Sequence, residues 1–280
     1  DPGRYYWSAL WTWFLGEGLI DLRRAVSVIQ FIGLSAGLLV VSRVIHNRLM
    51  LTLFGLLMAA WMLPQYKYFE SSLTMLGVYV AVYLIEKPTL RRIFITGIFV
   101  GLSAFIGRNH GLYMFVGFMT TLIYIHLKIS NMPFLNSIGT LAFGILIGYS
   151  PMIGMMIFIP GFFDGFWYSL YLLFMNETTT IPVQTPWPWL VDFTSTAWLP
   201  AILQVFLGVT FLLFIVFFLT AWVYIWFTSS SKISYARILL IASAFIGAAY
   251  IHHGFSRADV GHAASAIHPM LIGLIASIYL

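Results

Sequence analysis

The run LPAILQVFLGVTFLLFIVFFLTAWVYIWF at residues 199–227 decides the class of fold, because it contains no charged side chain. A helix needs about 20 apolar residues to cross a bilayer, so this run can span a membrane on its own. The apolar residues are continuous instead of alternating, and a helix satisfies its own backbone hydrogen bonds in lipid. The run therefore favours a helical membrane protein over a barrel.

Eight further apolar runs are long enough, or nearly long enough, to cross a membrane. They lie at 25–44, 49–63, 69–85, 90–107, 111–127, 135–160, 234–251 and 263–280. The sequence thus predicts an all-α fold, a polytopic transmembrane helix bundle of about nine spans. It forms a single transmembrane domain over residues 1–280 and has no soluble domain. The aromatic segments at 5–15 and 162–175 are typical of helices that lie in the membrane interface.

The composition excludes several classes of protein. Of the 280 residues, 61% are hydrophobic and only 8% are charged, whereas about a quarter of an average soluble domain is charged. A soluble enzyme is therefore excluded, and the scattered basic residues exclude a nucleic-acid partner. Without cysteine, the chain has no disulfide or thiolate metal site. It starts at Asp1 and ends inside an apolar run, so we expect a fragment that lacks a preceding helix and a C-terminal remainder.

The charges predict an orientation in the membrane. Alternate loops place eight of the 14 Lys and Arg residues on one side and eight of the nine acids on the other. Because cytoplasmic loops carry the excess of basic residues, the acidic side is expected to be extracytoplasmic. That side contains an interfacial loop at 1–24 and a second loop at 161–198.

Four polar clusters fall on this extracytoplasmic side, each at the end of an apolar run. They are DPGRYYW (1–7), YKYFE (66–70), GRNHG (107–111) and HHGFSRADVGH (252–262). Ionisable groups at membrane depth are costly and usually mark a pathway or a site. Their shared side predicts an active or binding site at the membrane boundary.

The first two clusters each allow two interpretations. Asp1 is either a general base at the boundary between water and lipid or the cap of a helix that begins at Pro2. Lys67 and Glu70 are either an i,i+3 pair at a helix start or a phosphate contact and the carboxylate that orients it.

The last two clusters also leave alternatives open. Arg108 and His110, in a tight turn between glycines, form either an anion clamp or a cation that reaches for the interface. Arg257 suits a phosphate, and Asp259 can hold it or tune His262; the alternative is a purely structural charge network. A divalent metal is conceivable there, but no recognised ligand motif is present, so neither metal nor cofactor is assigned.

Three segments together resemble a known family. Asp1-Pro2-Gly3 followed by YYWSALWTWFLGEG (5–18), then YKYFESSLTMLGVYVAVYL (66–84) and ITGIFVGLSAFIGRNHGLYMF (95–115), is similar to GT-C-type integral membrane glycosyltransferases. These polyprenyl-phosphate-sugar-dependent enzymes include the protein O-mannosyltransferases and lipid A aminoarabinose transferases. The resemblance covers residues 1–115 and is architectural. Pro2 stands where many members have a second acid, and no soluble periplasmic domain follows.

The resemblance implies a membrane enzyme that moves a sugar from a polyprenyl-phosphate donor to an acceptor hydroxyl. It implies Asp1 as the base, Lys67, Arg108 and Arg257 as phosphate contacts, and a multi-pass protein of a bacterial or archaeal plasma membrane with an extracytoplasmic site. The expected partners are the lipid-linked donor, membrane lipid and, in one alternative, partner subunits. The rival interpretations are a transporter of an anionic solute or lipid and a non-catalytic subunit of a membrane assembly.

Overall fold

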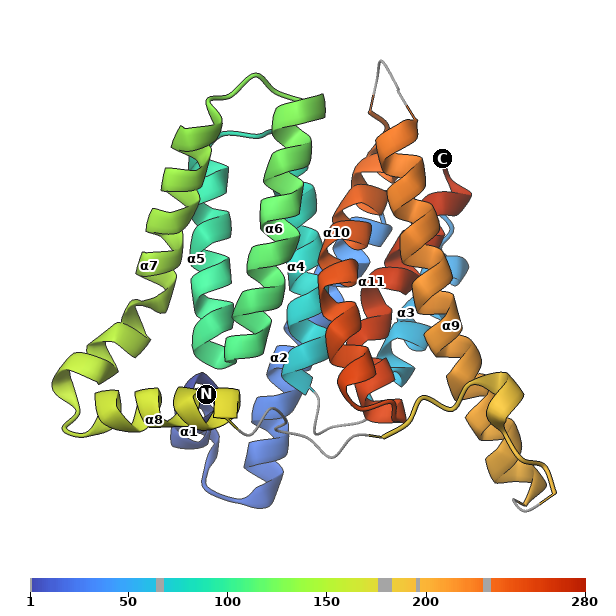
Figure 1. Ribbon diagram of the computed structural model, residues 1–280, viewed down its shortest axis with the longest axis horizontal. Coiled ribbons are helices and arrows are strands. Elements are labelled where there is room, and N and C mark those ends of the chain that lie inside the picture. Colours follow the sequence, from blue (N-terminus) through green and yellow to red (C-terminus); the bar gives the residue numbers. More distant parts are fainter. Residues whose placement is uncertain (1, 64–67, 176–182, 195–196, 229–232) are drawn as a thin grey trace.

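The computed structural model describes residues 2–63, 68–175, 183–194, 197–228 and 233–280. All regular structure within these ranges is helical, so the predicted all-α bundle is confirmed (Figure 1). The elements are α1 (Pro2–Leu15), α2 (Leu19–Val41), α3 (Arg48–Ala60), α4 (Tyr68–Glu86), α5 (Leu90–Ile106), α6 (Arg108–Lys128), α7 (Phe134–Phe158), α8 (Phe162–Met175), the 3-10 turn η2 (Pro188–Leu190), α9 (Trp198–Phe227), α10 (Tyr235–Ser256) and α11 (Val260–Ile278).

Each predicted apolar run coincides with a helix, but not every helix is a full span. In the described part of the chain, seven are long and apolar enough to cross a membrane: α2, α4, α6, α7, α9, α10 and α11. Helix α3 has 13 residues and α5 has 17, fewer than the roughly 20 that a span takes. Seven of the nine predicted runs therefore form helices of spanning length, and the other two form the shorter helices α3 and α5.

The predicted extracytoplasmic loops contain helices of their own. Helix α1 occupies most of the first loop, and α8 begins the second, as the aromatic segments indicated. Helix α2 starts at Leu19, six residues before the predicted run, because Asp21 closes its first turn by accepting a hydrogen bond from the Gly18 amide at 3.3 Å.

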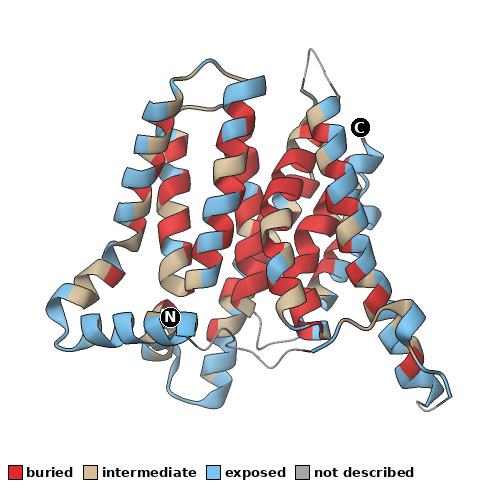
Figure 2. Cartoon of the chain, in the orientation of Figure 1, coloured by how far each residue is buried: buried red, intermediate tan, exposed pale blue. Residues whose placement is uncertain are grey.

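Burial is uneven across the bundle (Figure 2). In the apolar windows of α4 and α11, 72% of the residues are buried inside the protein, against 22% in α7 and 28% in α9. Helices α4, α10 and α11 therefore form the centre, while α7 and α9 expose broad apolar faces. In a bilayer such outward apolar faces contact lipid tails instead of water, so their exposure costs little free energy.

Two of the helices cross one end of the bundle instead of running through it. Helices α1 and α8 lie at the lower end in Figure 1, where α4, α6 and α11 begin and α5 and α10 end. We call this the α1–α8 end. Two of the four polar sequence clusters lie wholly in described residues and two lie there in part, and those residues all map to this end, as the alternation of spans predicted.

Helices α5 and α7 pack closely through four glycines. A Cβ added at Gly97, Gly101, Gly144 or Gly148 would come within 2.2–2.4 Å of a carbonyl oxygen on the facing helix. Small residues at such interfaces let two membrane helices approach until their backbones touch. This contact holds the otherwise exposed α7 in place.

We predict that Gly148→Ala lowers the free energy of unfolding by about 1–3 kcal/mol, because its methyl group would overlap the Ile98 carbonyl oxygen, at 2.2 Å. Thermal unfolding in detergent measures the change. Gly154→Ala on the same helix is the matched control, since a Cβ there meets no atom within 4 Å. Equal melting temperatures for the two variants would contradict the close packing.

Candidate functional site

A buried ion pair with a histidine connects α1 to the centre of the bundle. Arg4 Nη2 donates to Glu70 Oε1 at 3.0 Å and contacts His110 Nε2 at 2.7 Å. Glu70 and His110 are each only 2% exposed, whereas the Arg4 side chain is 31% exposed. A buried carboxylate is costly unless it is paired, so Arg4 is the partner that makes Glu70 tolerable there.

The contact with Arg4 favours one tautomer of His110. An arginine can only donate, so His110 Nε2 accepts and the neutral ring carries its proton on Nδ1. Nδ1 then donates to Tyr250 Oη at 3.3 Å, and the two rings stack with centroids 5.9 Å apart. His110 Nε2 also lies 3.7 Å from Glu70 Oε1, so the three side chains adjoin one another.

His253 lies between this group and the start of α11. Its ring centroid is 6.0 Å from that of His110 and 5.3 Å from that of His262. All three imidazoles are less than 10% exposed. Three neighbouring rings from α6, α10 and α11 thus form one buried histidine cluster.

Asp259 closes the other side of the cluster. As the cap of α11 it accepts from the His262 amide at 2.9 Å and from His262 Nδ1 at 2.8 Å, both at Oδ1, while Arg257 Nε donates to Oδ2 at 2.8 Å. Burial raises the pKa of Asp259, but the hydrogen bonds from His262 and the charge of Arg257 outweigh it, so the pKa is lower than usual. Asp259 therefore both holds the arginine and orients His262.

Arg108 and His110, which the sequence analysis grouped as one possible anion clamp, contact different neighbours. Only Gly107 separates α5 from α6, and Arg108 starts a helix instead of lying in a turn. Residues two apart on a helix face different ways, so His110 enters the histidine cluster while Arg108 donates to Ser169 Oγ on α8 at 3.2 Å. The two side chains belong to different sites.

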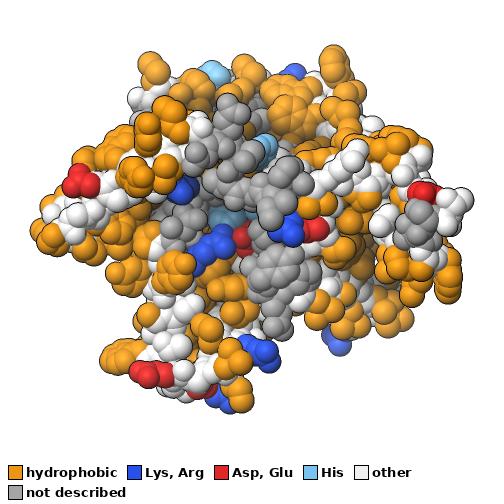
Figure 3. All heavy atoms as spheres, turned by 60° about the horizontal axis from the view of Figure 1, so that its bottom comes forward, with side chains coloured by type: hydrophobic (Ala, Val, Ile, Leu, Met, Phe, Trp, Pro, Cys, Tyr) orange, Lys and Arg blue, Asp and Glu red, His pale blue; other side chains and the backbone are white. Residues whose placement is uncertain are grey.

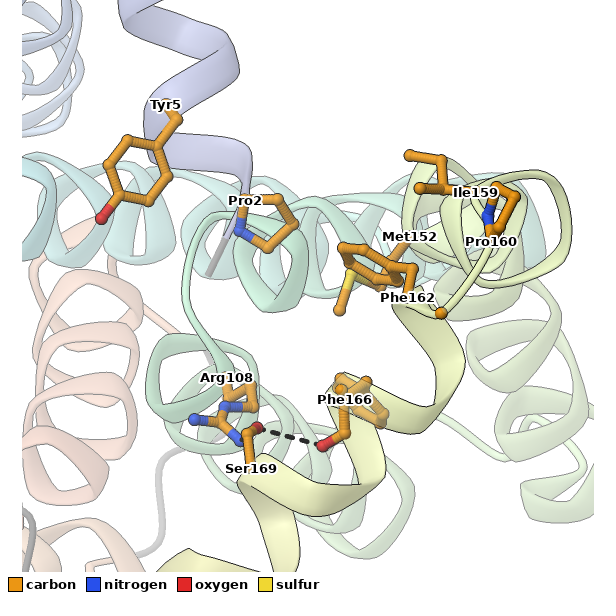
Figure 4. A pocket seen from close by; sticks show the side chains of 11 residues that line it. Pro2, Tyr5, Arg108, Met152, Ile159, Pro160, Phe162, Phe166 and Ser169 are labelled. Atoms are coloured by element: carbon orange, nitrogen blue, oxygen red, sulfur yellow. Dashed lines mark hydrogen bonds between the residues drawn. The ribbon is translucent and has the colours of Figure 1, made fainter.

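Arg108 lines a separate groove of about 570 Å³ between α1, α7 and α8 (Figure 4). Arg257, Asp259 and His262 are not among the residues that line this groove. Of the predicted site residues, the structure therefore unites Glu70 with His110, and Arg257 with Asp259 and His262. Asp1 and Lys67 lie outside the described residues.

Sequence reasoning missed three members of the site. Arg4, Tyr250 and His253 received no role, although Arg4 and His253 lie within two of the polar clusters. The signal that could have found Arg4 is the need of the buried Glu70 for a cation. Figure 3 shows the resulting mixture of basic, acidic and histidine side chains on this face, surrounded by hydrophobic ones.

The cluster is a charge-balanced group of polar side chains within an apolar bundle. Each buried or half-buried carboxylate faces a guanidinium, and the histidines add groups that can donate or accept a proton. Within the part of the chain that the structure describes, no group of three or more His, Asp or Glu side chains is arranged to hold a metal ion. The arrangement offers both hydrogen-bond donors and acceptors, as recognition of a hydroxyl-rich molecule requires.

Comparison of the chain with protein-family models, with curated proteins and with solved structures gives no match.

We predict that Arg4 and Glu70 are energetically coupled. Arg4→Gln should lower the free energy of unfolding by on the order of 3 kcal/mol, because it removes a hydrogen-bonded cation from a buried carboxylate. The double variant Arg4→Gln/Glu70→Gln should recover part of this loss, with a coupling energy of about 0.5–3 kcal/mol. A double-mutant cycle by chemical or thermal unfolding in detergent measures it.

The exposed pair of Arg24 and Asp21 at the same end is the matched control, for which we expect about 0–1 kcal/mol. Additive effects of the Arg4 and Glu70 substitutions would contradict the buried pair.

We also predict a pH dependence from Asp259. Because its folded-state pKa is lowered, its carboxylate stabilises the fold above its unfolded pKa, and this contribution is lost as the pH falls through the folded pKa. Thermal unfolding at pH 6 should therefore show a lower free energy of unfolding for Asp259→Asn than for the wild type, by less than about 1 kcal/mol because the pair is partly exposed. This difference should vanish in strong acid. A difference that does not change with pH would refute the ionic role.

Proposed function

We propose that the chain is a membrane glycosyltransferase that moves a sugar from a polyprenyl-phosphate donor to an acceptor hydroxyl at the extracytoplasmic face. The observation that carries the proposal is the reach of Arg4 from α1 to Glu70 on α4 and His110 on α6. It brings together the three segments whose sequences resemble GT-C glycosyltransferases. The same end of the bundle carries Arg257, Asp259 and His262.

The proposed reaction is an inverting displacement. The acceptor oxygen forms a bond to the anomeric carbon while the bond from that carbon to the phosphate oxygen breaks, and the phosphate leaves with the electron pair. Asp1 accepts the proton of the acceptor hydroxyl, a contribution typically worth about 10²–10⁴ in rate. Arg257 and Lys67 are the proposed contacts of the departing phosphate, whose negative charge they stabilise.

The location of the charges supports an enzyme over a transporter. Substrate sites of transporters usually lie near the middle of the membrane, between broken helices. Here the pairs Arg4–Glu70, Arg257–Asp259 and Arg43–Glu86 lie at the ends of the bundle. A purely non-catalytic subunit would leave its polar clusters scattered, whereas each of the four clusters contributes a residue here: Arg4, Glu70, His110 and His253 lie together.

The decisive variant is Asp1→Asn, which removes the proposed base and keeps the shape of the side chain. We expect a loss of sugar transfer of at least about 10²-fold. The assay incubates proteoliposomes with a panel of polyprenyl-phosphate sugars and measures the release of polyprenyl phosphate. The control is Glu17→Gln, an exposed acid of the α1–α2 connection, which should retain activity.

Wild-type turnover in Asp1→Asn would refute the assignment of the base. Failure of the wild type to turn over any donor of the panel, together with flux of an anionic solute or lipid, would favour the transporter.

A further inference from the structure

We propose that the groove between α1, α7 and α8 binds an anionic phospholipid of the surrounding bilayer, with Arg108 as the contact of its headgroup phosphate. This site is distinct from the histidine cluster and does not depend on the proposed glycosyl transfer. It combines one fixed cation, apolar walls and a position at the end of the spanning helices.

The walls of the groove are almost entirely apolar. The main apolar lining residues are Met152 and Ile159 at the end of α7, Phe162 and Phe166 on α8, and Pro2 on α1 (Figure 4). A volume of about 570 Å³ is large enough for a headgroup and the first part of its chains. Such walls favour the binding of a ligand that carries hydrocarbon next to its charge.

Arg108 provides the charge on this surface. Ser169 Oγ accepts from Arg108 Nη1 at 3.2 Å and itself donates to the Phe166 carbonyl at 3.0 Å, which fixes the guanidinium against α8. The planar guanidinium fork has several N–H donors and matches phosphate oxygens, so Arg108 suits an anion.

The position of Arg108 adds a second attraction. It opens α6, whose cap residue Gly107 provides no side-chain hydrogen bond and whose first turn contains no acidic residue. The positive end of the α6 dipole therefore acts with the guanidinium on an anion.

The position of the groove, at the end of the spanning helices, fits a lipid headgroup. Helix α8 lies across the α1–α8 end, and its exposed Phe163, Trp167 and Phe174 are the kind of side chains that mark a membrane interface. Beside it, the outward face of α7 exposes Phe158 and Ile157 to the acyl chains. A free phosphate would contact the charge but none of this surface, and a phosphatidylcholine would bring a second cation toward Arg108.

The experiment is native mass spectrometry of the purified protein after exchange with equal amounts of phosphatidylglycerol and phosphatidylcholine. We expect the wild type to retain phosphatidylglycerol preferentially, and Arg108→Gln to retain about tenfold less. Arg24→Gln, which removes an exposed arginine at the same end of the bundle, should retain as much as the wild type. Arg108→Lys should restore part of the binding, because it keeps the charge.

A second variant blocks the groove without touching the charge. Gly165 lines the groove, and a Cβ there meets no atom within 4 Å, so Gly165→Leu should fill the space, keep the fold and reduce retained phosphatidylglycerol. Gly154→Leu is its control, since Gly154 is equally unobstructed but does not line the groove.

Three results would overturn the proposal. One is equal retention of phosphatidylglycerol by the wild type and Gly165→Leu. Another is loss of binding in Arg24→Gln to the same extent as in Arg108→Gln. The third is displacement of phosphatidylglycerol by inorganic phosphate alone, or by stoichiometric polyprenyl phosphate, which would assign the groove to a free anion or to the sugar donor.

Discussion

The contact on which the site depends is the guanidinium of Arg4, held between the buried Glu70 carboxylate and His110 Nε2. A carboxylate in an apolar bundle must be neutralised, and here the cation comes from a helix that does not cross the membrane. Helix α1 is further fixed by Gly3, where any Cβ would meet the Phe105 carbonyl oxygen at 2.7 Å. The polar interior and the position of α1 therefore stabilise each other.

From this contact the polar groups continue inward. His110, His253 and His262 link it to the Asp259 cap of α11, so α1, α4, α6, α10 and α11 share one cluster. Arg108 is directed away from it, into the groove with α8. One end of the bundle thus carries two neighbouring surfaces with different chemistry, a balanced network of acids and bases and a cationic groove with apolar walls.

Much of the fold could be predicted from the sequence, because continuous apolar runs allow little besides helices. The common end of the polar clusters followed from the alternation of spans. Side-chain partners could not be predicted: Glu70 pairs with Arg4, 66 positions away, and no local pattern encodes that contact. Arg108 and His110 were assigned to one site because a turn was expected between the two spans. Because α6 starts at Arg108, helical geometry directs the two side chains to different faces.

Solid-state nitrogen-15 NMR of protein labelled at histidine tests the central contact most directly, with the His110 signals identified by their loss in His110→Gln. We predict a His110 ring proton on Nδ1 and an unprotonated Nε2 whose chemical shift changes in Arg4→Gln. A His110 protonated at Nε2, or an Nε2 signal that is indifferent to the loss of Arg4, would contradict it.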